Sequence, residues 1–287
     1  MLVHLRIHDM TRSLGLALLL FASTLSAQLQ EGDRAWANRA AGSQNGRAMA
    51  DPVNAAIAAY QRAVTAEPNN LEARFKLLRA YRFKGAYVAS TSDQKKAVYG
   101  EAKKAGADAI KVADRALNVT NKSTEKQVAN AARSVPGAAE VYLWDAINWG
   151  EWALAYGKLA AAREGAADRI RRQATIALLV NPGIEGGTPA RVLGRLHDQT
   201  PRIPFITGWA SGREAVKFLN ESLKLDPANK ITIVFLAEAM ASNDEKTKPQ
   251  AIAMLRSAIS APVDPEFVVE QTAALNDARA LLKKLGG

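Results

Sequence analysis

The residues best suited to hold a ligand lie in one aromatic-rich segment. Its members are Trp144, Asn148, Trp149, Trp152 and Tyr156. Trp144, Asn148, Trp152 and Tyr156 recur at a spacing of four, which places them on one face of a helix. Ligand pockets are mostly apolar with a few polar groups. The pattern therefore leaves two interpretations open: an aromatic-walled cavity with Asn148 as its polar contact, or an ordinary helical core.

Two arginines one helical turn apart form a second candidate site. Arg191 and Arg195 follow the glycine-rich run at residues 183–189. A helix N-terminus with two guanidinium groups can hold a carboxylate or a phosphate. The alternative is that both arginines form ion pairs with acids on the surface or on neighbouring helices. The run is not a phosphate-binding P-loop, because no Gly-Lys-Ser/Thr sequence closes it.

No set of residues predicts catalysis. His197 is the only histidine beyond the first ten residues, and there is no cysteine. The serines lack the Gly-x-Ser-x-Gly context of a hydrolase nucleophile, and a metal site needs more ligands than this chain offers. We therefore expect a packed His197, no metal site, no cofactor and no enzymatic activity.

The elements that carry these residues follow from a repeated pattern of small and bulky side chains. It runs Ala-x3-Φ-x2-Ala-x4-Pro, where Φ is Tyr, Phe or Leu, and it is typical of the second helix of a tetratricopeptide repeat. It occurs at Ala56, Tyr60, Ala63 and Pro68, at Ala215, Leu219, Ser222 and Pro227, and at Ala251, Leu255, Ala258 and Pro262, where Ser222 replaces an alanine and Pro262 comes one residue early. The pattern predicts an all-α fold of degenerate helical hairpins stacked as a right-handed α-solenoid. Such arrays bind partners and rarely catalyse.

Proline, glycine and capping residues set the expected helix boundaries. The predicted helices cover residues 52–66, 71–83, 93–117, 124–135, 138–163, 166–180, 190–197, 213–225, 231–241, 248–260 and 266–285. Residues 198–212 are expected to form a long loop. No run alternates at the two-residue period of a strand. We therefore expect one helical repeat domain over residues 28–287.

The first 27 residues are predicted to be a secretory signal peptide. Arg6 and Arg12 precede an uncharged stretch at residues 13–29, with small residues at 23–24 and 26–27. The apolar core is short for a spanning helix, which needs about 20 residues. We therefore expect export to the periplasm, with an uncleaved anchor as the alternative. Because the chain has no cysteine, it can carry neither a disulfide nor the lipid of a bacterial lipoprotein.

The chain is basic, with 38 Lys and Arg against 28 Asp and Glu, a formal net charge of +10. The basic residues are interleaved with acids, as in Lys104, Asp108 and Lys111, which is typical of solvated helix faces. An anionic ligand or an acidic partner surface is the alternative. Nucleic acid is not expected, because an exported protein rarely meets it.

Several segments resemble the T-component family of tripartite ATP-independent periplasmic (TRAP) transporters. They are ARVLGRL at residues 190–196, REAVKFL at 213–219, FLAEA at 235–239 and ARALL at 278–282. The resemblance implies a helical periplasmic scaffold that engages the solute-binding subunit, with a cavity or pore for a small, hydrophobic ligand. It also implies a homo-oligomer, since some members form trimers. Many members are lipoproteins, whereas this chain has no cysteine to modify. A general periplasmic scaffold for envelope assembly, without a ligand, is the alternative function.

Overall fold

The computed structural model describes residues 27–287 of the chain. Most of these residues are helical, with no β-strand among them and one isolated bridge between Gln44 and Arg47. Residues 27–37 form a first helix. The others are α2 (Ala50–Ala66), α3 (Leu71–Phe83), η1 (Lys84–Val88), α4 (Ser92–Ala116), α5 (Glu125–Ala132), α6 (Ala138–Tyr156), α7 (Lys158–Arg163), α8 (Ala166–Val180), α9 (Thr188–Gln199), α10 (Gly212–Leu225), α11 (Lys230–Asn243), η2 (Glu245–Thr247), α12 (Lys248–Ser260), η3 (Pro265–Phe267) and α13 (Val268–Lys284). The predicted signal peptide lies outside the described residues except for Ala27.

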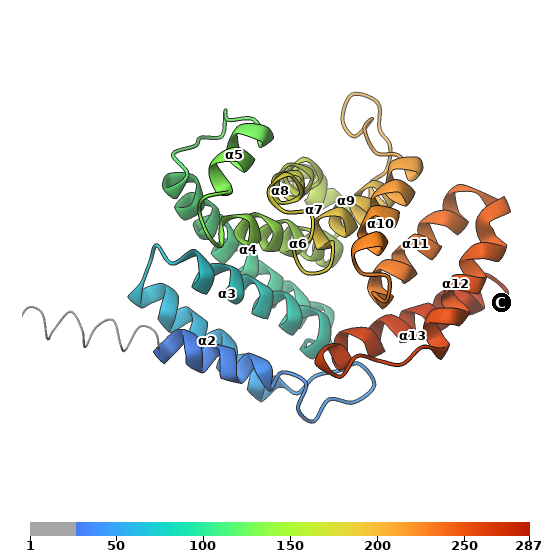
Figure 1. Ribbon diagram of the computed structural model, residues 1–287, viewed down its shortest axis with the longest axis horizontal. Coiled ribbons are helices and arrows are strands. Elements are labelled where there is room, and N and C mark those ends of the chain that lie inside the picture. The colour runs from blue at the N-terminus through green and yellow to red at the C-terminus, as the bar shows by residue number, and fades with distance from the viewer. Residues whose placement is uncertain (1–26) are drawn as a thin grey trace, which may run out of the picture.

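The helices pack as antiparallel pairs that stack along the chain (Figure 1). The pairs are α3 with α4, α6 with α8, α9 with α10, and α11 with α12, and α13 packs on the last pair. First helices of consecutive pairs contact each other, whereas consecutive second helices make few contacts or none within the described residues. The first helices therefore line the concave side of a curved stack. The predicted all-α, tetratricopeptide-like architecture is confirmed.

The repeated signature explains how closely the helices pack. All nine of its small and bulky residues, from Ala56 to Ala258, are buried. Small residues let two helix backbones approach, and the bulky residue fills the space between them. Pro68, Pro227 and Pro262 each stand two residues beyond the end of their helix, at α2, α10 and α12. Pro262 comes one residue early because α12 ends one residue early.

Gly157 divides a predicted helix, whereas Gly85 lies within a continuous helical stretch. The helix predicted over residues 138–163 is divided at Gly157, whose φ of 91° favours glycine, so α6 and α7 are separate helices. Gly85 does not end α3, because the backbone continues through it as the π-helix η1. A Cβ at Gly85 would lie 2.4 Å from the ring of Tyr99. Gly85 thus permits a close approach between η1 and α4.

The two ends of the described chain meet. Arg39 is buried and donates to the Glu270 carboxylate at 3.2 Å and to the Glu266 carbonyl at 2.6 Å. Gly46 lies so close to Ala273 that a Cβ there would come within 2.6 Å of its backbone nitrogen. Figure 1 shows α13 running back beside the segment that follows the first helix. The stack is therefore closed on itself by its first and last elements.

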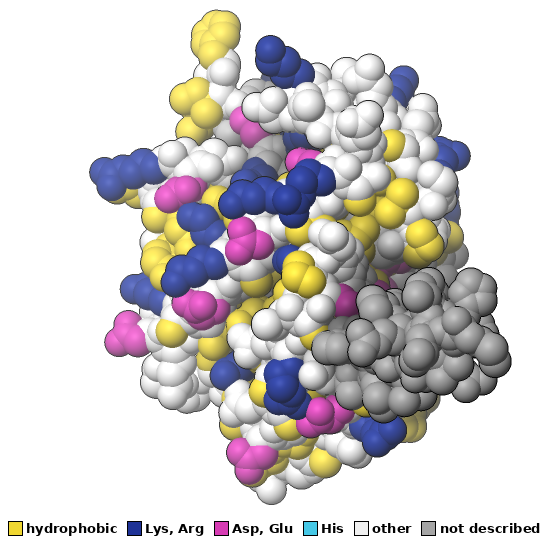
Figure 2. All heavy atoms as spheres, turned by 90° about the vertical axis from the view of Figure 1, so that its left-hand side faces the viewer, with side chains coloured by type: hydrophobic (Ala, Val, Ile, Leu, Met, Phe, Trp, Pro, Cys, Tyr) yellow, Lys and Arg dark blue, Asp and Glu magenta, His cyan; other side chains and the backbone are white. Residues whose placement is uncertain are grey.

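The outer charges are mixed in sign. Figure 2 shows Lys and Arg side chains interspersed with Asp and Glu on the face that forms the left of Figure 1. On α4, Lys104 pairs with Glu101 at 2.8 Å and Lys111 with Asp108 at 3.2 Å. The interpretation of these residues as a solvated helix face therefore agrees with the structure.

Candidate functional site

Charged side chains link the first helices along the concave side. Arg82 of α3 pairs with Glu151 of α6 at 3.2 Å, and Arg195 of α9 pairs with Glu238 of α11 at 2.6 Å. Between these two pairs, Arg79 of α3 approaches Glu185, in the turn before α9, at 3.9 Å. We call this set the concave network: Arg79, Arg82, Glu151, Glu185, Arg191, Arg195 and Glu238. It is the part of the concave side where charges of opposite sign face each other across helix boundaries.

Arg195 is fully engaged by the protein itself. Besides Glu238, its guanidinium binds Asp198 at 3.1 Å, and it lies 4.3 Å from the ring centroid of Phe235. These contacts tie α9 to α11. The structure therefore favours the ion-pair interpretation for Arg195.

Arg191 is different, although it lies only one helical turn away. It forms no ion pair with any described carboxylate. Its guanidinium donates to the hydroxyl oxygens of Thr188 at 2.6 Å and Thr232 at 3.3 Å. Burial and the positive charge of Arg82 lower the pKa of Arg191 to about 10, against the opposing effects of Glu185 and Asp226. A half-buried cation that has no close ion pair is stabilised when an anion binds directly to it.

Two buried N–H groups near Glu185 have no hydrogen-bond acceptor among the described residues. They are Nε of Arg79 and Nε1 of Trp144, whose residue is only 7% exposed. Burial raises the pKa of the Glu185 carboxyl. The positive charges of Arg79 and Arg191 and the indole N–H of Trp144 oppose this effect and lower the pKa. The indole N–H lies close enough to Glu185 to lower that pKa, yet it has no acceptor in hydrogen-bond geometry among the described residues. Two unpaired donors, from Arg79 and Trp144, and the charge of Arg191 therefore act on one carboxylate.

The aromatic residues of α6 do not form one wall. Trp144 packs with Val112 and Val128 in one cluster, whereas Trp149 and Trp152 pack with residues of α8 and α9 in another. Each step of four residues turns a side chain by about 40° around a helix, so Tyr156 lies about 120° from Trp144. Tyr156 is exposed and stacks on Trp152 at 4.8 Å between ring centroids. A ligand-binding role for this stripe as a whole stays a prediction.

Asn148 is fully buried where α6 crosses α3. Its amide donates to the carbonyl of Leu78 at 3.0 Å and to that of Trp144 at 2.9 Å, while its Oδ1 has no partner. A neighbouring helix thus satisfies the donor side of the amide. This observation favours the structural interpretation of Asn148.

His197 is packed, as the sequence predicts. Its ring meets Trp209 edge-on at 5.2 Å and stacks on Phe218 at 5.6 Å. Its Nδ1 accepts the backbone N–H of Ser211 at 3.3 Å, which fixes the start of α10. Burial lowers the pKa of the imidazole.

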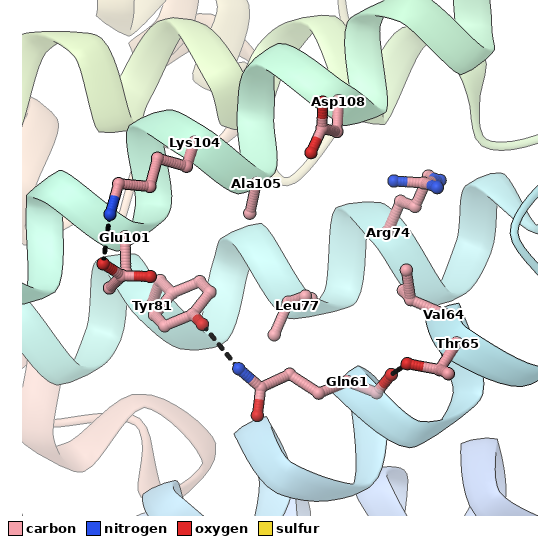
Figure 3. A pocket seen from close by; sticks show the side chains of 10 residues that line it. All are labelled: Gln61, Val64, Thr65, Arg74, Leu77, Tyr81, Glu101, Lys104, Ala105 and Asp108. Carbon is pink, nitrogen blue, oxygen red and sulfur yellow. Dashed lines mark hydrogen bonds and ion pairs between the residues drawn. The ribbon is translucent and has the colours of Figure 1, made fainter.

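A pocket of about 340 Å³ lies between α2, α3 and α4 (Figure 3). Val64, Leu77 and Ala105 contribute its apolar lining. Its polar side chains largely pair with one another or with the backbone: Gln61 donates to Tyr81 at 2.8 Å, Lys104 binds Glu101 at 2.8 Å, and Arg74 donates to the Pro68 carbonyl at 2.7 Å. No residue of the predicted sites lines it. The pocket thus offers a ligand fewer free polar groups than the concave network does.

Arg79 and Glu185 of the concave network are not predicted from the sequence. Arg79 has no distinguishing context, because arginines on helix surfaces are common. Glu185 stands in the glycine-rich run at residues 183–189, where no motif marks it as a ligand-binding residue. Within residues 27–287, no group of three or more His, Asp or Glu could hold a metal ion. No helix in that part of the chain is long and apolar enough to cross a membrane.

Comparisons with known proteins add little. No protein-family model matches the sequence, and no curated protein matches it. Among solved structures, the complex of the TPR2AB domain of yeast Sti1 with pHSP90 is similar, at 14% sequence identity and a TM-score of 0.32, over 93% of this chain and 100% of that chain. The likeness is too remote to bear on function, and the fold is established by the packing of the helices themselves.

Proposed function

We propose that this protein is a non-enzymatic periplasmic scaffold that binds the solute-binding subunit of a TRAP-type transporter and holds a small ligand. The stacked helical pairs support a scaffold, because such stacks present long surfaces to partners. The resemblance of residues 190–240 to the T-component family supports this choice of partner. The donor-rich concave network supports a ligand.

A projecting apolar loop is the observation that carries partner binding. The loop between α9 and α10 extends from the body of the molecule (Figure 1). At its tip Ile203 is 46%, Phe205 107% and Ile206 66% exposed. Monomeric proteins seldom expose neighbouring bulky side chains without an intermolecular use. Three such residues on a convex tip fit a concave pocket of a partner protein.

The tip is held in shape before any partner binds. The hydroxyl of Thr207 accepts the N–H of Ile203 at 3.0 Å and donates to the carbonyl of Pro201. Phe205 has a φ of 64°, a left-handed conformation that is unfavourable for a bulky residue. Neither the exposure nor the strained backbone stabilises the free protein. A preorganised apolar anchor does strengthen association, because little conformational entropy is lost when it binds.

The test is the affinity for purified TRAP solute-binding subunits of the source organism, measured by calorimetry. The double variant Phe205→Ser, Ile206→Ser should bind at least about tenfold more weakly than the wild type, as expected for a buried interface anchor. Leu225→Ser is the matched control, because Leu225 is an exposed apolar residue at the end of α10, 50% exposed. Equal affinities for the double variant and the wild type, or no complex with the wild type, would contradict the proposal.

A further inference from the structure

The carboxylate of Glu185 is weakly held at the centre of the concave network. Its ion pair with Arg79 spans 3.9 Å, whereas the Arg195–Glu238 pair in the same network spans 2.6 Å. The Glu185 side chain is 37% exposed, although the donors around it are buried. The carboxylate can therefore leave toward solvent without passing through the core.

The carboxylate of Glu185, as placed, leaves donors around it without a partner. Nε of Arg79 and Nε1 of Trp144 are buried without a partner, and Arg191 has only hydroxyl groups as partners. Each unsatisfied buried donor costs about 1–3 kcal/mol relative to a paired one. A better-placed carboxylate would accept from both unpaired donors and form an ion pair with Arg191.

The backbone that presents Glu185 is unusual. Glu185, Gly186 and Gly187 have successive φ values of 45°, 65° and 83°, all in the left-handed region. Glycine adopts this region readily, but glutamate does not. The hydroxyl of Thr188 donates to the Glu185 carbonyl at 2.7 Å and holds the turn in place. The fold thus maintains a strained residue whose carboxylate lies near Arg79, Arg191 and the indole N–H of Trp144.

We propose that Arg79, Arg191 and Trp144 form a binding site for the carboxylate of a small organic acid, and that Glu185 occupies this site while no ligand is bound. The planar guanidinium groups match a carboxylate, and the indole N–H supplies a further donor. Exchange of one carboxylate for another leaves the local charge unchanged. A phosphate dianion would instead add negative charge to a region that already contains Glu140 and Asp226. The site specifies the small ligand of the proposed function and rests on that part of it, but it does not depend on partner binding.

The first test removes the internal carboxylate. Acetate, butyrate, benzoate and inorganic phosphate are titrated into the mature chain, with calorimetry and the indole N–H signal of Trp144 as readouts. Trp144→Phe assigns that signal. Glu185→Gln should bind the organic carboxylates about tenfold more tightly than the wild type, because the competing side chain no longer occupies the site. Glu245→Gln, the same change at an exposed acid, should leave the affinity unchanged.

The second test removes a donor. Arg191→Lys keeps the positive charge but loses the planar fork, so carboxylate affinity should fall about tenfold while the melting temperature stays close to that of the wild type. The inference is overturned if Glu185→Gln and the wild type bind carboxylates equally or not at all. It is also overturned if phosphate binds more tightly, or if the Trp144 signal does not shift. The Phe205→Ser, Ile206→Ser variant must still bind carboxylates, which separates this site from the partner surface.

Discussion

At the scale of single residues, two buried polar side chains on α6 connect this helix to its neighbours. Asn148 and Asp145 are both fully buried, yet both keep one oxygen without a hydrogen-bond partner. Asn148 joins α6 to α3 through its amide, and Asp145 joins α6 to α8 through Arg169 at 3.3 Å. Because both side chains are buried, a substitution at either residue should first change the free energy of unfolding.

Replacement of Asn148 by leucine should destabilise the protein. The change removes two hydrogen bonds, including the one to Leu78, and should lower the free energy of unfolding by about 1–3 kcal/mol. Asn220→Leu is the control, because Asn220 is exposed and its amide bonds only within its own helix. Urea denaturation of both variants is the measurement. A more stable Asn148→Leu protein would instead favour an amide that faces a ligand cavity.

Asp145 should make stability depend on pH. Burial raises its pKa from 3.8 to about 6, against the opposing effects of Arg169 and Gln173. Because the folded state binds the proton more tightly than the unfolded state, this contribution favours folding at pH 4 and is lost as the pH rises through about 6. The size of the change is about 3 kcal/mol. Asp145→Asn should lack it, so the stability difference between the two proteins should change between pH 4 and pH 7. A constant difference would show that Asp145 does not titrate in this range.

At the scale of helices, the sequence predicts well which helices form and how they pair. It predicts less well the residues at which each helix begins and ends. The signature residues Ala215 and Leu219 predict buried contacts because small and bulky side chains must interlock wherever two helices cross. Gly85 and Gly157 look alike in the sequence, yet one allows a ring to approach and the other breaks a helix. That difference depends on residues distant in the chain. For the same reason the sequence found Arg191 and Trp144 but not Arg79, which only the fold brings near Glu185.

An overpacked signature position tests the stacking directly. Ala215 is fully buried in α10. Ala215→Trp should force its neighbours apart and lower the free energy of unfolding by about 1–3 kcal/mol. Ala280→Trp, at an exposed position of α13, is the control. Thermal denaturation of both variants is the measurement, and equal melting temperatures would show that position 215 is not a packing contact.

At the scale of the whole molecule, closure between the first and last elements holds the curved stack. Gly46→Ala should weaken this contact, because the new Cβ would meet the backbone of Ala273 and φ at this residue is +76°. We expect faster hydrogen exchange in α13, measured by mass spectrometry. Gly150→Ala is the control, since nothing lies within 4 Å of a Cβ there. Unchanged exchange in α13 would mean that the ends are held by other contacts.

Export is a separate prediction for the whole chain. Terminal sequencing of the protein from a periplasmic extract should begin at Ala27 or Gln28, because small residues precede these positions. Recovery of an intact Met1 or Met10 in the membrane fraction would instead indicate an uncleaved anchor.

Partner binding through the projecting loop is the central claim, and a photo-crosslinking amino acid at position 205 tests it most directly. Phe205 is fully exposed in the free protein, so a crosslinker there reports only on a bound partner. In cells, irradiation should join the protein to a TRAP solute-binding subunit, identified by mass spectrometry, and the same crosslinker at position 225 should not. Crosslinks from position 205 to envelope-assembly proteins, or to no protein, would contradict the account.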